Sequence, residues 1–269
     1  HQVRLEYFQL HTKLGLFLGW RAPGLAPTAL STWAPMGWQK GEPEKKKDFD
    51  PIPLIADKEP LLYRNFIKGA GNRGIGIGFP GWLNLAWSAE TMNLALVWRG
   101  AFMDASMHWN SRGGGHKPPM GYDIVAPVPE GWVSLAELTS ADAEWPRINE
   151  HGRAEGFEWF GYRLDQDRNP TFRYQWKGAV VEDHVTAEGD GKTPAGRIIR
   201  TIKFDGPIPK TARFLVAASD KITAKDGAWI VSDRALKITV SGAKPELAHG
   251  RLTFPVQEGP VTLTYSWTK

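Results

Sequence analysis

The 269-residue chain contains no cysteine. This absence excludes disulfide bonds, a cysteine nucleophile and the attachment of c-type haem through a CxxCH motif. It fits a protein exported into an oxidising compartment, where unpaired thiols are oxidised. We expect the chain to carry no cofactor, so that any haem it works with belongs to a partner.

The chain also lacks an apolar run long enough to cross a bilayer as a helix, which takes about 20 residues. The apolar run near the N-terminus, Leu14–Trp20, is much shorter than that. We expect a short amphipathic or interfacial helix over Val3–Leu18, and a protein that is peripheral to a membrane.

Neither sign of charge predominates. Lys and Arg total 33, Asp and Glu total 29, and the formal net charge is +4. A nucleic-acid-binding domain usually carries a clustered basic face, so we expect no nucleic-acid partner. Hydrophobic residues make up 42% of the chain, which is enough for a sizeable core at this length.

Several enzyme motifs are missing. The chain has neither a G-x-S-x-G turn for a serine nucleophile nor a phosphate-binding P-loop. Residues 69–74 match G-x-G-x-x-G, but a dinucleotide site needs a helix after that motif. Here Ile75–Phe79 alternates apolar residues with glycine, as a strand does, and such glycines allow an aromatic ring to approach closely. We expect no bound nucleotide, and we assign no catalytic residue.

Histidines are few, and none are paired at metal-ligand spacing. The chain has seven, without a His-x-His or His-x3-His pair. The chain begins with His1 and not with Met, which fits the removal of a leader. An N-terminal histidine can hold copper if a second histidine comes close, but no spacing supports this, and we expect no metal centre.

What the chain has in abundance is strand-like sequence. We expect a hairpin of Trp82–Trp87 and Leu94–Gly100, joined by a polar turn at residues 88–93. We expect one or two helical turns at Ser134–Leu138. Further strand-sized runs are separated by turn residues such as Gly, Pro and Asp. These runs are Phe157–Leu164, Thr171–Trp176, Ala179–Thr186, Arg197–Phe204, Ala212–Ala217, Ala228–Ser232, Leu236–Ser241, Arg251–Val256 and Val261–Trp267.

These patterns predict a mainly β protein. We expect residues 51–269 to form one antiparallel β-sandwich, of which a large super-sandwich of the mutarotase kind is one form. We expect residues 1–50 to form an extended N-terminal arm and linker.

Short sequences typical of one family recur over residues 54–269. They are Tyr63–Phe66, Gly69–Gly71, Arg73–Gly78, Asn84–Ala86, Leu94–Trp98, Gly100–Ala105, His108, Gly113–Gly115, Pro118–Gly121, Gly161–Asp165 and Pro170–Tyr174. Through these short sequences the chain resembles a β-rich domain that has no assigned activity. This domain occurs beside c-type haem (CxxCH) domains in large exported bacterial cytochrome-like proteins. The resemblance implies a periplasmic or exported protein whose partner is a c-type cytochrome or another subunit of a membrane electron-transfer complex.

The N-terminal arm is rich in proline and tryptophan and ends in a charged linker at Gly41–Asp48. Such a segment cannot bury a core of its own. Either it lies as a strap across the β domain, or it docks on a partner or a membrane surface, because exposed tryptophan is enriched at interfaces. The candidate contact residues are Phe17, Trp20, Trp33 and Trp38.

The stretch Asp104–Gly121 is predicted to be a loop. Long loops on a rigid β scaffold often carry function, and this one holds His108, Trp109, Arg112 and His116. These residues are the candidates for a ligand-binding or partner-binding patch. The alternative is an ordered connection between two sheets.

Two functions of different class follow. The first is a non-catalytic periplasmic accessory subunit that docks on and stabilises a membrane-bound electron-transfer complex of the respiratory or photosynthetic reaction-centre type. The alternative is a carbohydrate-binding or carbohydrate-processing β-sandwich, because the 13 tryptophans suit stacking on sugars. A cleft lined by exposed tryptophan and two carboxylates favours the alternative. The candidate carboxylates are Glu90, Asp104, Asp123, Glu155 and Glu158.

Overall fold

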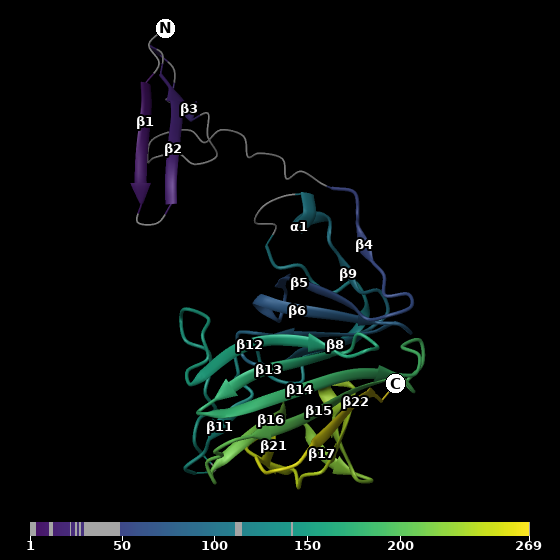
Figure 1. Ribbon diagram of the computed structural model, residues 1–269. Coiled ribbons are helices and arrows are strands. Elements are labelled where there is room, and N and C mark those ends of the chain that lie inside the picture. Colours follow the sequence, from purple (N-terminus) through teal and green to yellow (C-terminus); the bar gives the residue numbers. More distant parts are fainter. Residues whose placement is uncertain are drawn as a thin grey trace. The chain divides into compact units, whose positions relative to one another are not determined.

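The computed structural model describes residues 4–10, 13–21, 23–24, 26, 28–29, 49–110, 115–140 and 142–268. The chain divides into two compact units, residues 1–49 and residues 50–269. The protein is mainly β, and its strands pair antiparallel, as the sequence predicts (Figure 1). No helix among the described residues is long and apolar enough to cross a membrane.

The N-terminal unit contains a β-hairpin. Strand β1 (Arg4–Leu10) pairs with β2 (Lys13–Trp20), which also pairs with β3 (Thr28–Ala29). The helix expected over Val3–Leu18 is therefore wrong. Leucines alternate along β2 with a period of two, and β2 contains two glycines, each of which costs a helix about 1 kcal/mol relative to alanine.

The first layer of the larger unit is a sheet of eight strands in the order β12–β13–β14–β15–β22–β19–β18–β17. Seven of its strands confirm strand-sized runs predicted from the sequence, whereas β17 was not predicted. Side chains alternate between buried and less buried along β14 and β22, so one face is apolar. The elements are β12 (Phe157–Leu164), β13 (Pro170–Trp176), β14 (Ala179–Glu188), β15 (Arg197–Asp205), β17 (Ile222–Lys225), β18 (Ala228–Val231), the 3-10 helix η1 (Ser232–Arg234), β19 (Leu236–Ser241) and β22 (Val261–Trp267).

Two smaller sheets cover the apolar face of the first layer, and the three sheets share one continuous core. Their strand orders are β10–β8–β7–β6–β5 and β11–β16–β21–β20. The larger unit is thus an antiparallel β-sandwich, and the predicted hairpin is confirmed as β7 and β8. The strands are β5 (Leu61–Ile67), β6 (Gly71–Phe79), β7 (Leu83–Ser88), β8 (Asn93–Arg99), β10 (Tyr122–Val125), β11 (Leu135–Glu137), β16 (Ala212–Ala218), β20 (Glu246–Ala248) and β21 (Arg251–Pro255).

One local expectation is wrong, and another is confirmed. The helical turns expected at Ser134–Leu138 are wrong, because β11 pairs with β16 there and buries Leu135 and Ala136 in two different apolar clusters. The β7–β8 turn is polar, as expected, but it is buried: Glu90 is 8% exposed. The Ser134 backbone N–H donates to this turn over 3.0 Å.

The outer face of the five-stranded sheet is covered by residues 101–110 and 115–121, which we call the cap. In place of the predicted loop, the cap holds β9 (Met103–Asp104), which pairs with β4 (Pro53–Leu54), and the helix α1 (Ser106–Asn110). Figure 1 shows these elements on the side of β5 and β6 that faces away from the eight-stranded sheet. A second apolar cluster around Phe102 fills the space between the cap and the sheet.

Glycines on β6 make room for the cap. Ile75 and Ile77 belong to the core between the two layers. A Cβ atom at Gly76 would lie 3.1 Å from the Phe102 ring, and one at Gly78 would lie 2.9 Å from it. The ring therefore lies against bare backbone, which confirms what the alternation of glycine predicts.

A buried ion pair between β14 and β15 lies in the core. Arg200 Nη2 is 2.5 Å from Asp183 Oδ2, and the two side chains are 1% and 0% exposed. Trp87 Nε1, on the facing five-stranded sheet, donates to Asp183 Oδ2 over 3.1 Å. Within the eight-stranded sheet, Arg200 Nη1 donates to Tyr265 OH on β22 over 3.2 Å. Burial on its own lowers the pKa of Arg200, but the Asp183 carboxylate outweighs it and raises the pKa. The guanidinium is therefore charged.

Breaking this ion pair will destabilise the larger unit. We expect Arg200→Met to lower the free energy of unfolding by about 3–5 kcal/mol, measured by urea denaturation, because it leaves Asp183 as an unpaired buried charge. The matched control is Arg197→Met on the same strand, whose pair with Glu188 is 53% and 52% exposed. We expect Arg197→Met to lower the free energy of unfolding by less than about 1 kcal/mol. Equal losses in the two variants would contradict the prediction.

Candidate functional site

Asp104 ties the cap to the sandwich. Its Oδ1 accepts hydrogen bonds from the backbone N–H groups of Ser106 and Ile52, both over 2.9 Å. Its Oδ2 accepts one from Ser106 Oγ over 2.8 Å and lies 3.5 Å from Lys117 Nζ. Burial on its own raises the pKa of Asp104, but these donors and the Lys117 charge outweigh it and hold the pKa at about 2. One carboxylate thus fixes the start of α1 and joins it to two other segments.

A chain of hydrogen bonds connects β5 to α1. Asn65 Nδ2 donates to Tyr63 OH over 3.2 Å, and Tyr63 OH lies 2.6 Å from His108 Nδ1. His108 Nε2 lies 2.8 Å from the Gly115 carbonyl oxygen. Because a carbonyl only accepts, Nε2 carries the ring proton and Tyr63 donates its O–H to Nδ1. Burial raises the pKa of Tyr63, which keeps this donor protonated.

Aromatic side chains reach the surface around this chain. Phe66 is 38% exposed and Trp109 is 60% exposed. The Phe66 ring centroid lies 5.9 Å from that of His116 and 6.2 Å from that of His108, and Trp109 makes an edge contact with Tyr63 at 6.5 Å. We call Phe66, Trp109 and His116 the aromatic patch.

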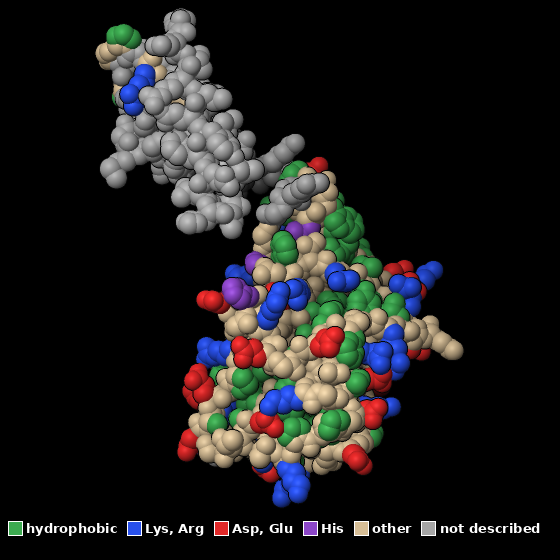
Figure 2. Space-filling view, turned by 60° about the vertical axis from the view of Figure 1, so that its left-hand side comes forward, with side chains coloured by type: hydrophobic (Ala, Val, Ile, Leu, Met, Phe, Trp, Pro, Cys, Tyr) green, Lys and Arg blue, Asp and Glu red, His purple; other side chains and the backbone are tan. Residues whose placement is uncertain are grey.

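Basic side chains border the aromatic patch. Arg64 on β5 and Arg73 on β6 line a shallow hollow together with Phe66. Lys68 is exposed on the connection between these two strands. Figure 2 shows green, blue and purple side chains close together on the uppermost part of the larger unit as drawn. The surface therefore combines exposed aromatic area with positive charge.

The structure brings together three of the four predicted loop residues. His108 and Trp109 lie on α1, and His116 reaches the same patch from the other end of the cap. The fourth, Arg112, lies outside the described residues. Sequence reasoning missed Tyr63 and Asn65 as residues of this site, although residues two apart on a strand share a face.

The predicted arm residues are placed only in part. Phe17 and Trp20 lie on strand β2, and their side chains lie outside the described part of the chain. Trp33 and Trp38 lie outside it altogether. Their role as partner contacts stays a prediction.

The candidate carboxylates have separate structural roles. Asp104 holds the cap, Asp123 pairs with Arg99, and Glu90 is buried in the β7–β8 turn. Among the described residues, no three His, Asp or Glu side chains come together where they could hold a metal ion. The G-x-G-x-x-G match leads into strand β6, so the helix that a dinucleotide site requires is replaced by a strand.

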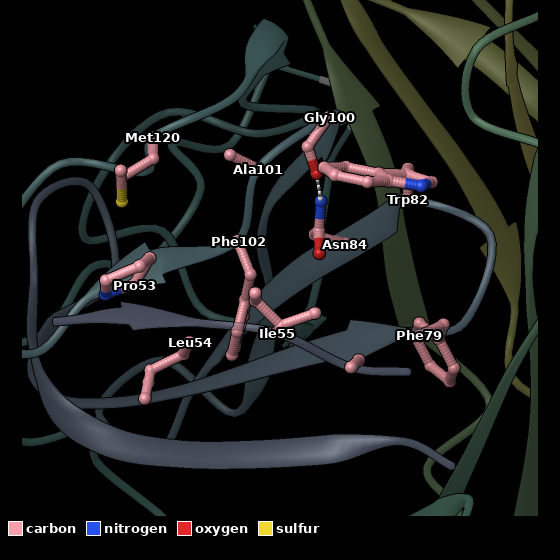
Figure 3. A pocket seen from close by; sticks show the side chains of 11 residues that line it. Pro53, Leu54, Ile55, Phe79, Trp82, Asn84, Gly100, Ala101, Phe102 and Met120 are labelled. Carbon is pink, nitrogen blue, oxygen red and sulfur yellow. Dashed lines mark hydrogen bonds between the residues drawn. The ribbon is translucent and has the colours of Figure 1, made fainter. Parts of the chain in front are cut away.

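An open apolar pocket lies beside the cap. It is lined by residues 53–56, by the end of β6 and the start of β7, and by residues 100–102, and its volume is about 540 Å³ including the mouth (Figure 3). Trp82 on this pocket is 47% exposed. The described residues that line it include no carboxylate.

Comparisons of the chain with protein-family models, with curated proteins and with solved structures gave no match. The resemblance to the cytochrome-associated domain therefore stays a hypothesis, together with the partner and the location that it implies.

The Asp104 carboxylate will make the stability of the larger unit depend on pH. Its pKa is about 2 in the folded protein and about 4 in an unfolded chain. Its contribution is therefore fully present above about pH 4 and is lost as the pH falls towards 2. We expect Asp104→Asn to lower the free energy of unfolding by roughly 2 kcal/mol at pH 7, and by progressively less below pH 4. Glu155→Gln, at an exposed position, is the control; a constant deficit from pH 7 to pH 2 would contradict the assignment.

Removing the Tyr63 hydroxyl will loosen α1. We expect Tyr63→Phe to lower the free energy of unfolding by about 1–2 kcal/mol, because His108 Nδ1 loses its donor. Amide hydrogen exchange at Trp109, whose N–H donates to Ala105 O, will become faster. The control is Tyr162→Phe, since the Tyr162 hydroxyl makes no hydrogen bond within the described part of the chain. Unchanged exchange at Trp109 would show that Tyr63 does not hold the helix.

Proposed function

We propose that the protein is a non-catalytic accessory subunit that docks on and stabilises a membrane-bound electron-transfer complex containing a c-type cytochrome, of the respiratory or photosynthetic reaction-centre type. It works in the periplasm or outside the cell, at the membrane surface. The larger unit supplies the main contact, and residues 1–50 supply a second one.

The observation that supports docking is the aromatic patch. Phe66 and Trp109 are exposed, yet each belongs to a segment whose backbone is held by hydrogen bonds to the sandwich. Aromatic side chains on rigid elements bury large areas on binding and lose little conformational entropy. Tryptophan and arginine dominate the hot spots of interfaces, and Arg64 and Arg73 border this patch.

The N-terminal residues extend the proposed interface. A stable interface buries about 800 Å² on each partner, which is more than a few aromatic rings provide. Phe17, Trp20, Trp33 and Trp38 are the proposed additional contacts, with a partner subunit or with the membrane surface, where tryptophan is enriched.

The carbohydrate alternative has less support from the geometry. It needs a cleft that combines exposed tryptophan with two carboxylates. The pocket at Trp82 supplies the tryptophan, but the described residues of its wall carry no carboxylate. A second, smaller hollow is lined by Glu90, Glu130 and Trp132, but Trp132 is half-buried and Glu90 is 8% exposed, so this hollow does not combine an exposed tryptophan with two accessible carboxylates. Docking is therefore the function that the described geometry favours.

The docking proposal predicts that the aromatic patch retains a haem protein. Immobilised protein is incubated with detergent-solubilised membranes of the organism that makes it, and the bound fraction is assayed for covalently attached haem after denaturing electrophoresis. We expect the double variant Phe66→Ser/Trp109→Ala to retain at least about tenfold less c-type cytochrome, because two hot-spot side chains are removed. A chain that starts at Phe49 will retain an intermediate amount.

The control is Phe160→Ser, which removes a side chain that is 45% exposed on β12, outside the cap. It will retain as much cytochrome as the unaltered protein. Docking on a cytochrome complex is wrong if the unaltered protein retains no haem protein, or if Phe160→Ser loses as much as the double variant.

A further inference from the structure

The floor of the apolar pocket is formed by rigid strands. Phe79 ends β6, and Asn84 lies near the start of β7. The wall formed by Phe102 is fixed, because its ring lies against the bare backbone of Gly78. The cavity is therefore part of the folded sandwich and is formed before any ligand arrives.

Asn84 places one hydrogen-bond acceptor in this apolar space. The residue is 2% exposed, and its Nδ2 donates to the Gly100 carbonyl oxygen over 2.9 Å. Because that carbonyl only accepts, the orientation of the amide is fixed. In Figure 3 the amide oxygen points away from Gly100, towards the side of the pocket where Ile55 and Phe102 lie. No donor within the described part of the chain reaches this oxygen.

The mouth of the pocket exposes large apolar side chains. Ile55 is 69% exposed, Trp82 is 47% exposed and Met120 is 43% exposed. The described lining residues include no charged side chain. A charged ligand would lose hydration there and find no charged side chain in the described lining, so the pocket favours an uncharged one.

We propose that this pocket binds a small uncharged molecule with a flat apolar ring and a single O–H or N–H donor, of the phenol or indole class. The ring fills the space between Phe102 and Trp82, where aromatic rings pack well against each other. Its donor bonds to Asn84 Oδ1, an acceptor that is open to the pocket and that no donor in the described part of the chain reaches. Measured as the space open to a water-sized sphere, the pocket is about 150 Å³, the size of an apolar cavity that binds benzene.

This binding activity goes beyond the docking function. Neither Phe66, Trp109 nor His116 lines the pocket. Changes in the pocket therefore test the ligand site without altering the aromatic patch, and the cytochrome assay reports on the patch alone.

The test compares two probes that differ in one hydrogen-bond donor. Indole has an N–H group, whereas 1-methylindole has the same ring without a donor. Dissociation constants for the full chain are measured by ligand-observed NMR titration. We expect indole to bind about three- to tenfold more tightly, the range given by one net hydrogen bond.

Three variants test whether the two probes bind in this pocket. Ala101→Trp fills the pocket without changing Asn84 and will abolish binding of both probes. Asn84→Leu will bring the indole to 1-methylindole ratio to about 1, provided that thermal unfolding shows a folded protein. Ile55→Glu changes only an exposed rim residue and will weaken both probes by about threefold or more through the loss of apolar contact. The matched control is Leu247→Glu, at a position that is 39% exposed on β20 and does not line the pocket.

The proposal is overturned if neither probe binds at millimolar concentration, or if the unaltered protein binds both equally. It is also overturned if Ala101→Trp and Ile55→Glu bind both probes as the Leu247→Glu control does. Should Asn84→Leu fail to fold, the probe ratio in the unaltered protein and the two pocket variants still decide the question.

Discussion

The Arg200–Asp183 ion pair constrains how the layers of the sandwich fit together. Both groups lie out of reach of water, so their hydration must be replaced by partners within the protein, and some of these come from the facing sheets. Trp87 of the five-stranded sheet supplies an N–H, and the ring of Phe214 in the four-stranded sheet lies 5.6 Å from the guanidinium carbon. The pair therefore has its full set of partners only when all three sheets are in place. This requirement links the formation of the two smaller sheets to the formation of the large one.

Most of the strands could be predicted because strand formation leaves a local signal. Ile75–Phe79 and the β7–β8 hairpin show it in their alternation and their turn residues. The errors arose where local composition was ambiguous. Val3–Leu18 contains enough leucine for a helix but has the period of a hairpin, and β11 is a strand because β16 pairs with it across a long stretch of sequence. Which strands share a sheet depends on such distant contacts, and no short window of sequence contains them.

Part of the candidate site could also be predicted from the sequence. The composition of the cap singled out His108, Trp109 and His116. The hydrogen bond that fixes His108 comes from Tyr63 on a strand more than forty residues earlier in the sequence, so only the fold reveals it. The apolar pocket left no sequence signal, because its walls come from four separate segments and its polar atom is a single asparagine oxygen.

The glycine face of β6 also determines the register of that strand. The side chains of a strand alternate between its two faces, so a slip by one residue would exchange the two faces. The isoleucines would then collide with the Phe102 ring, and the glycines would leave voids in the core between the layers. Pairing in the wrong register is therefore unfavourable on both faces of the strand. The strand thus accepts one alignment with β5 and β7.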